Sequence, residues 1–335
     1  MIRARLPGPV PLGIVVLVLF AVLPLVANPY LLFIGNQLCI YVILSIGLNL
    51  LVGYAGQLAF AQAALFGIGA YAAGLAQVRL GVPLIVAIPG GVVVATVIGL
   101  SIALPALRLS GHYLALATLA FAQFANWVFQ HWDSVTFGGG GFRVPTPPMP
   151  AFISAGLASY YIAFLCAAVV TIAAARIVRS RIGRAMIAVR DGEVAAASLG
   201  VDLLATKSIA FGLSAACAGI AGGLQTLMLG FVSPESFDLT QMVLQQAMIV
   251  VGGLGSIAGS VIGAAILMVL QEGLRAFQSA QEIAFGGLLL GVVVLAPGGI
   301  AGFMARHFAS WREQYLWGPT APGASAPALA AKPAP

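Results

Sequence analysis

The segment from Arg176 to Lys207 reads RIVRSRIGRAMIAVRDGEVAAASLGVDLLATK and holds nine of the 24 charged side chains of the chain. Apolar runs long enough to span a membrane lie on both sides of it. Asp191 is placed to cap a helix that begins near Glu193, and Gly200 is placed to end that helix in a left-handed turn. The pattern predicts a capped surface helix, which serves either as a docking surface or as a loop held at lipid headgroups by its arginines. Asp202 is placed to cap the next helix.

The composition indicates a protein that lives in the lipid bilayer. Of the 335 residues, 61% are hydrophobic and 7% are charged, whereas a soluble domain has about 25% charged residues. The mean hydropathy is +1.06, and the 41 glycines suit membrane helices, in which glycine is common. The net charge of +6 does not indicate nucleic-acid binding, because the basic residues lie beside apolar runs. The sequence predicts an all-α polytopic membrane protein.

About eight apolar runs have the length of a transmembrane helix, and one further run is broken. The eight runs are 10–27, 31–51, 57–76, 83–105, 112–130, 157–178, 208–230 and 283–300. The broken run is 242–271, which GGLGS interrupts at 252–256. We expect one transmembrane domain over residues 1–317, with a cytoplasmic segment at 179–207. The Pro- and Ala-rich tail at 318–335 is predicted to be disordered.

The positions of the basic residues predict which side of the membrane each loop faces. If 179–207 is cytoplasmic and the spans alternate, the amino terminus is cytoplasmic and the loops 131–150 and 231–241 lie outside. A full crossing by 242–271 would send the basic residues of the carboxyl terminus outside. A re-entrant hairpin bent at GGLGS would keep both termini cytoplasmic, and we prefer it because broken helices are tolerated where they are buried in protein. It leaves three basic residues outside: Arg79, Arg143 and Arg275.

Small and uncharged polar residues within the spans are candidates for close packing or for lining a pathway. The small residues are Gly67, Gly219, Gly252, Gly253 and Gly255. The polar residues are Asn49, Gln57, Gln62 and Gln123. No charged residue lies near the middle of a clear span, which argues against a carrier driven by a coupled ion.

Groups that carry out chemistry are missing from the sequence. It has no phosphate-binding G-x-x-x-x-G-K-[ST] motif, and its three histidines and three cysteines are scattered without metal-ligand spacing. No nucleophile has a base nearby in the sequence. We therefore predict no catalytic residues, no metal site and no cofactor, and we expect the driving energy to come from another chain.

Five stretches are informative when they are taken together. They are LSIGLNLLVGYAGQLAFAQAALFGIGAYAAGL (44–75), LRLSGHYLALATLAFAQ (107–123), GRAMIAVRDGEVAAASLGVD (183–202), SPESF with MIVVGGLGSIAGSVIGAAIL (233–237 and 248–267), and APGGIAGF (296–303). The set resembles the LivM-like permeases of branched-chain amino-acid ABC transporters over residues 31 to 303. Two positions depart from the family pattern. Relatives tend to have an acidic residue in place of Gln123 and a G-P-N-G-like sequence in place of Gly138 to Gly141.

The resemblance implies the membrane-spanning subunit of an importer in the bacterial inner membrane. Its partners would be a second, homologous permease, two cytoplasmic ABC ATPase subunits and a periplasmic substrate-binding protein. The resemblance assigns coupling to the ATPase to the region of Arg184, Arg190, Glu193, Ala195, Ala196 and Gly200. Its substrate would be a branched-chain or related small amino acid. The alternatives are a self-contained channel for a small polar solute such as urea or an amide, and a membrane scaffold without transport.

Overall fold

The computed structural model describes residues 28–106, 111–145, 155–274, 286–287, 291 and 298–302. The predicted first span (10–27), most of the last span (283–300) and the tail (318–335) lie outside these residues.

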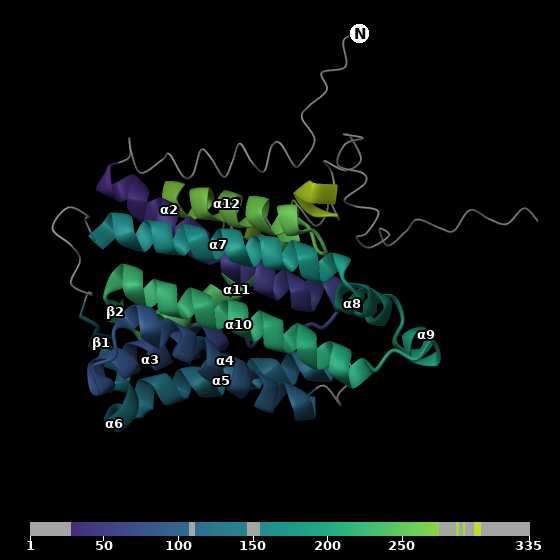
Figure 1. Cartoon of the computed structure of the whole chain (residues 1–335), viewed down its shortest axis with the longest axis horizontal. Coiled ribbons are helices and arrows are strands. Elements are labelled where there is room, and N and C mark those ends of the chain that lie inside the picture. Colours follow the sequence, from purple (N-terminus) through teal and green to yellow (C-terminus); the bar gives the residue numbers. More distant parts are fainter. Residues whose placement is uncertain are drawn as a thin grey trace, which may run out of the picture.

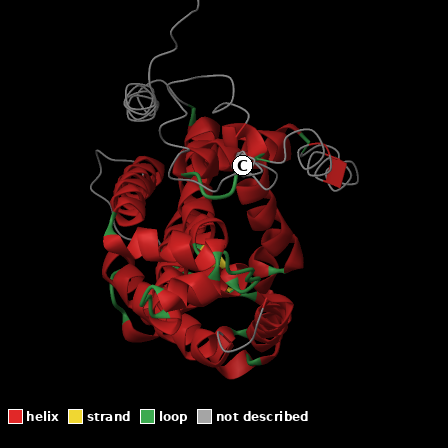
Figure 2. Ribbon diagram, turned by 90° about the vertical axis from the view of Figure 1, so that its right-hand side faces the viewer, coloured by secondary structure: helices red, strands yellow, loops and turns green. Residues whose placement is uncertain are grey.

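Helices make up most of the described chain, and only two short strands occur in it (Figure 2). The elements in order are α2 (Pro29–Asn49), η2 (Leu50–Tyr54), α3 (Gln62–Leu80), α4 (Leu84–Ala106), α5 (Gly111–His131), α6 (Asp133–Thr136), η3 (Gly138–Gly140), β1 (Phe142–Arg143), α7 (Ala155–Arg179), α8 (Arg181–Asp191), α9 (Glu193–Ser198), α10 (Leu203–Leu229), β2 (Phe231–Val232), η4 (Pro234–Phe237), α11 (Leu239–Gly252) and α12 (Ile257–Gly273). The long helices run side by side (Figure 1). α8 and α9 lie at one end, which we call the α9 end, whereas β1, β2 and α6 lie at the other, the strand end.

Five of the helical stretches are long and apolar enough to cross a membrane. They are Pro29–Tyr54, Gln62–Leu80, Val86–Pro105, Gly156–Arg179 and Leu203–Leu229. α5 has 21 residues, and it occupies the predicted span at 112–130. The prediction of an all-α polytopic membrane protein is confirmed.

The prediction for the third span is wrong at its beginning, because α3 starts at Gln62 and residues 56–61 are not helical. Polar side chains bind the backbone of this irregular stretch. The Phe60 N–H donates to Thr118 Oγ1 at 3.0 Å, and Gln246 Nε2 donates to the Ala59 carbonyl at 2.9 Å. Such contacts allow non-helical backbone inside a membrane protein, since no water is present to satisfy it.

The broken run at 242–271 forms a hairpin, as the re-entrant prediction requires. α11 has 14 residues, so it is only about 21 Å long and shorter than the hydrocarbon core of a bilayer. α12 packs back against it, because a Cβ added to Gly252 would lie 2.7 Å from the carbonyl carbon of Gly259. The end of α12 returns to the beginning of α2, where the Tyr30 hydroxyl donates to Glu272.

Small residues bring α3, α4 and α10 into close contact. A Cβ added to Gly219 of α10 would lie 2.8 Å from Val92 Cα, and one added to Gly69 of α3 would lie 2.6 Å from Gly219 Cα. Gly67 instead faces aromatic rings, with Phe129 at 2.7 Å from its added Cβ. Helices in lipid associate through such faces because water does not drive apolar contact there.

Candidate functional site

Residues 179–207, which we call the coupling segment, fold into two short helices at the α9 end. Ser180 caps α8, because its hydroxyl oxygen accepts a hydrogen bond from the Ile182 N–H at 3.2 Å. The inner face of α8 is buried and consists of Gly183, Met186 and Val189. The segment is therefore anchored by apolar packing on one side and leaves its other side open.

The predicted N-cap role of Asp191 is wrong. Asp191 is the last residue of α8, and its Oδ1 accepts from Arg190 Nη2 at 2.9 Å, whereas Gly192 precedes α9 and makes no side-chain cap. The sequence pattern missed α8, whose last turn uses Asp191. The cap predicted for α10 is confirmed, since the Ala205 N–H donates to Asp202 Oδ1 at 3.0 Å.

The predicted left-handed end of α9 is also confirmed. Gly200 has a φ of +84°. Its N–H donates to the Ala197 carbonyl and the Val201 N–H donates to the Ala196 carbonyl, both at 3.0 Å. These two bonds are the pair that ends a helix in a Schellman motif, in which glycine is preferred because it has no Cβ. Gly200 thus sets the direction of the chain into α10.

The outer side of the coupling segment is apolar and basic. Val194 and Leu199 are 86% and 83% exposed, more than any other large hydrophobic side chain in the described ranges. Arg184 is exposed and its Nη1 donates to the Arg179 carbonyl at 3.1 Å. Exposed apolar side chains thus lie beside exposed basic ones on the outer side of this folded segment.

The predicted coupling residues divide into an outer and an inner group. Ala195 is exposed, whereas Ala196 is 2% exposed and faces the bundle. Glu193 is half-exposed and binds Lys207 of α10, with Oε1 and Nζ 2.7 Å apart. Arg190 points inward, with its Nη1 donating to the Gly53 carbonyl at 2.9 Å. Only Arg184, Glu193, Ala195 and Gly200 of the six are exposed.

Asn49 is the most highly connected of the predicted pathway residues. Its side chain is 1% exposed, and its amide binds the turn of the hairpin, residues 253–256. Nδ2 donates to the Ser256 carbonyl at 2.9 Å and to Ser260 Oγ at 2.6 Å, while Oδ1 accepts from the Gly255 N–H at 2.8 Å. Gly253 also contacts Gly298, whose carbonyl oxygen would lie 2.9 Å from an added Cβ. Asn49 therefore fixes the hairpin within the bundle.

The predicted glutamines lie in different surroundings. Gln62 is buried, and its Oε1 accepts from Ser214 Oγ at 2.6 Å. Gln57 is buried in the irregular stretch and donates to the Ala55 carbonyl at 3.3 Å. Gln123 is exposed on α5, as are Phe124 and Trp127 on the same helix. The structure therefore does not bring Gln123 to the buried amides, and a continuous line of these four residues does not form.

Gln245 is one of the few uncharged polar residues within the apolar runs, but it is not among the predicted site residues. It is 1% exposed, and neither atom of its amide has a hydrogen-bond partner among the described residues. A buried amide without a partner costs free energy unless water or a solute binds it. The sequence pattern did not separate Gln245 from Gln246, because the two are adjacent and only the helical rotation of α11 decides which one is buried.

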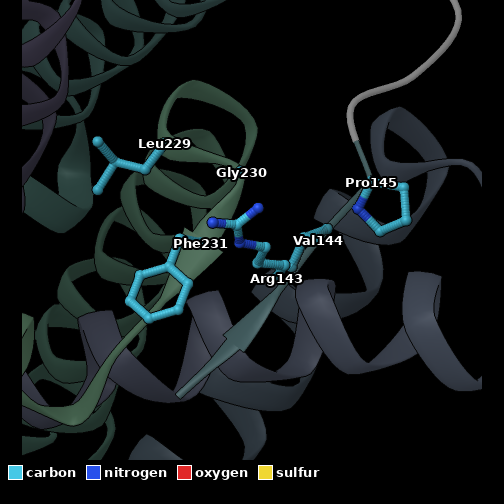
Figure 3. A pocket seen from close by; sticks show the side chains of 6 residues that line it. All are labelled: Arg143, Val144, Pro145, Leu229, Gly230 and Phe231. Atoms are coloured by element: carbon cyan, nitrogen blue, oxygen red, sulfur yellow. The ribbon is translucent and has the colours of Figure 1, made fainter. Parts of the chain in front are cut away.

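The strand end carries a shallow depression of about 620 Å³. It is lined by β1, β2 and the end of α10, and Arg143 is the charged residue in its wall (Figure 3). β1 and β2 pair antiparallel, with Arg143 opposite Phe231. In the described parts of the chain, no three His, Cys, Asp or Glu side chains come together as metal ligands would.

Comparison with known proteins agrees with this architecture. Residues 30–297 match the family described as the permease component of branched-chain amino acid transport systems. The permease LivM of Escherichia coli K12 is 31% identical over 286 residues, which is 78% of this chain and 67% of LivM. LivH of the same organism is 28% identical over 284 residues, which is 78% of this chain and 91% of LivH.

A relative that matches a shorter part of the chain is named for a different transported molecule. The autoinducer 2 import permease LsrC of Klebsiella pneumoniae is 34% identical over 140 residues, which is 38% of this chain and 40% of LsrC. No solved structure matches the chain significantly. The family match covers the chain from the beginning of α2 to the last described segment, so this multi-pass membrane protein belongs to the family of branched-chain amino acid transport permeases.

Proposed function

We propose that this chain is the membrane-spanning subunit of an ABC importer for branched-chain or related small amino acids in the bacterial inner membrane. ATP hydrolysis takes place on two cytoplasmic ATPase subunits, and a homologous second permease completes the pathway. The names of LivM and LivH support the substrate class. The coupling segment supports the dependence on partner subunits, since it is folded, anchored on one side and open on the other.

The exposure of Val194 and Leu199 is the observation that carries this proposal. Val194 lies in the first turn of α9, and Leu199 follows the last residue of α9 beside the Schellman turn at Gly200. The neighbouring basic side chains suit an acidic rim on a partner. A loop that only meets lipid headgroups needs basic residues but no Schellman turn. A self-contained channel needs no docking surface of this kind.

The strand end faces the periplasm in this proposal and offers its depression to a substrate-binding protein. Cysteines placed at Gly140 and at Val194 test the orientation. Gly140→Cys is expected to react with an impermeant maleimide added outside whole cells, and Val194→Cys only after the cells are opened. The unmodified chain is the control, because Cys39 and Cys217 are buried and Cys166 is only partly buried, so it measures the background labelling. Labelling of both variants from outside would contradict the orientation.

Replacing Gly200 tests the coupling segment. Gly200→Val is expected to reach the membrane in normal amounts but to lose most uptake, because a β-branched side chain at φ +84° costs about 1–2 kcal/mol and shifts the turn into α10. The space around Gly200 is open, so a loss of uptake would come from the strained backbone conformation and not from steric overlap. Uptake by the complex and co-purification of the ATPases are measured together.

Gly200→Asn is the matched control, since asparagine tolerates the left-handed conformation better than other residues with a Cβ. It is expected to keep most of the uptake. Wild-type uptake from Gly200→Val would mean that this turn does not position the docking surface. If the chain alone takes up substrate without ATP, the proposal of an ABC importer is wrong and the alternative of a self-contained channel is favoured.

A further inference from the structure

Arg190 connects the coupling segment to the interior of the membrane domain. Its side chain is 12% exposed, although arginine is rarely buried without a partner. Nη1 donates to the Gly53 carbonyl at 2.9 Å, and Nε and Nη2 donate to Asp191 Oδ1 at 3.1 and 2.9 Å. Three of the five N–H donors of the guanidinium are thus engaged within this chain. Such an arginine is poorly placed to reach a partner protein.

The chain at Gly53 to Gly56 is shaped around this arginine. A Cβ on Gly56 would lie 2.7 Å from Arg190 Cγ, and the φ of Gly56 is +69°. The arginine stem therefore lies directly against the Gly56 backbone, while its head group holds the Gly53 carbonyl. Gly53 belongs to η2, a π-helical turn, and such turns are frequent at functional sites.

Gly53 also contacts the turn of the hairpin on its other side. A Cβ on Gly53 would overlap the Gly255 nitrogen. Asn49, four residues earlier, binds Gly255, Ser256 and Ser260 through its amide. Arg190, the 49–56 stretch and the 253–256 turn thus form an unbroken series of hydrogen bonds and backbone contacts, in which the buried Asn49 side chain lies beside both Gly53 and Gly255.

We propose that Arg190 is a positioning residue that transmits movement of the coupling segment through Gly53 to the hairpin turn at residues 253–256. This inference rests on the proposed function, because it needs a partner that moves the coupling segment. A movement of the cytoplasmic partner then reaches the hairpin through Arg190, although α8 lies between the hairpin turn and the docking surface. Coupling through packed elements needs such a contiguous physical connection.

The test uses the complete complex with its ATPase subunits, reconstituted in lipid. Arg190→Met keeps the apolar stem and removes all donors, and Arg181→Met removes an exposed charge from the same helix as a control. For Arg190→Met we expect the ATPases to co-purify and ATP hydrolysis to continue, while uptake per ATP falls ~10-fold or more, a change within the usual range for coupling between two sites. Arg181→Met is expected to keep the parental ratio, and Arg190→Lys to recover part of it.

A cysteine at Leu254, which is 39% exposed in the turn, reports on the hairpin directly. Its rate of thiol labelling is expected to change on addition of ATP in the parent and in Arg181→Met, but not in Arg190→Met. A parental ratio of uptake to ATP in Arg190→Met would overturn the inference, and so would loss of the ATPases from that variant, which would make Arg190 a partner contact. If the parent itself does not bind ATPases, the proposed function fails, and this inference fails with it.

Discussion

Gly222→Ala is expected to prevent stable folding of the permease. An added Cβ would overlap the Phe66 carbonyl oxygen and lie 2.5 Å from the Ala70 nitrogen, so α3 and α10 must separate. Both obstacles are backbone atoms, which have no alternative rotamer. Overpacking in a tight core costs about 1–3 kcal/mol and occasionally more, and we expect the upper end of this range or beyond. Thermal unfolding of the purified chain in detergent measures the loss.

Gly212→Ala is the matched control in the same helix. Its added Cβ meets only the Leu100 side chain, with Cδ2 at 3.3 Å, and a leucine methyl can move. Because alanine favours helix more than glycine does, by about 1 kcal/mol, Gly212→Ala is expected to be neutral or stabilising. Equal stability of the two variants would show that α3 and α10 do not meet at Gly222.

Asn49→Leu is expected to release the hairpin from the bundle. Leucine has the same branching and number of heavy atoms, but its methyl groups are larger and it leaves the Gly255 N–H without the partner it has in Asn49. The Ser256 carbonyl keeps the Ser260 N–H and hydroxyl as donors. One buried polar group left unpaired costs about 1–3 kcal/mol, and the larger methyl groups add to this cost. We expect a large fall in thermal stability and faster thiol labelling of a cysteine at position 254.

Asn36→Leu provides the comparison, because Asn36 is also buried in α2. Its Nδ2 donates to Ser159 Oγ at 3.2 Å, while its Oδ1 has no partner among the described residues. Loss of one hydrogen bond is offset by removal of an unpaired acceptor, so the expected change is within about 1 kcal/mol. An equal effect of both substitutions would mean that Asn49 does not hold the hairpin specifically.

Two local features of the coupling segment could be predicted from the sequence alone. The cap at Asp202 and the left-handed turn at Gly200 depend on side chains and φ angles within four residues. Such short-range geometry follows from residue type alone. The prediction of a cap at Asp191 is wrong, because Arg181 to Asp191 itself forms an amphipathic helix that ends at this residue.

The sequence by itself determined the class of the protein: the apolar spans, the interruption at GGLGS and the charged segment between two spans. These follow from hydropathy, glycine content and charge, which act residue by residue. Only the tertiary structure decided that α3 begins at Gln62, that Gln123 lies apart from the buried amides and that Arg190 turns inward to Gly53. The first and the last of these depend on a partner more than 50 residues away, Thr118 for Phe60 and Gly53 for Arg190. Periodicity within one helix cannot specify such a partner, because packing between helices chooses it.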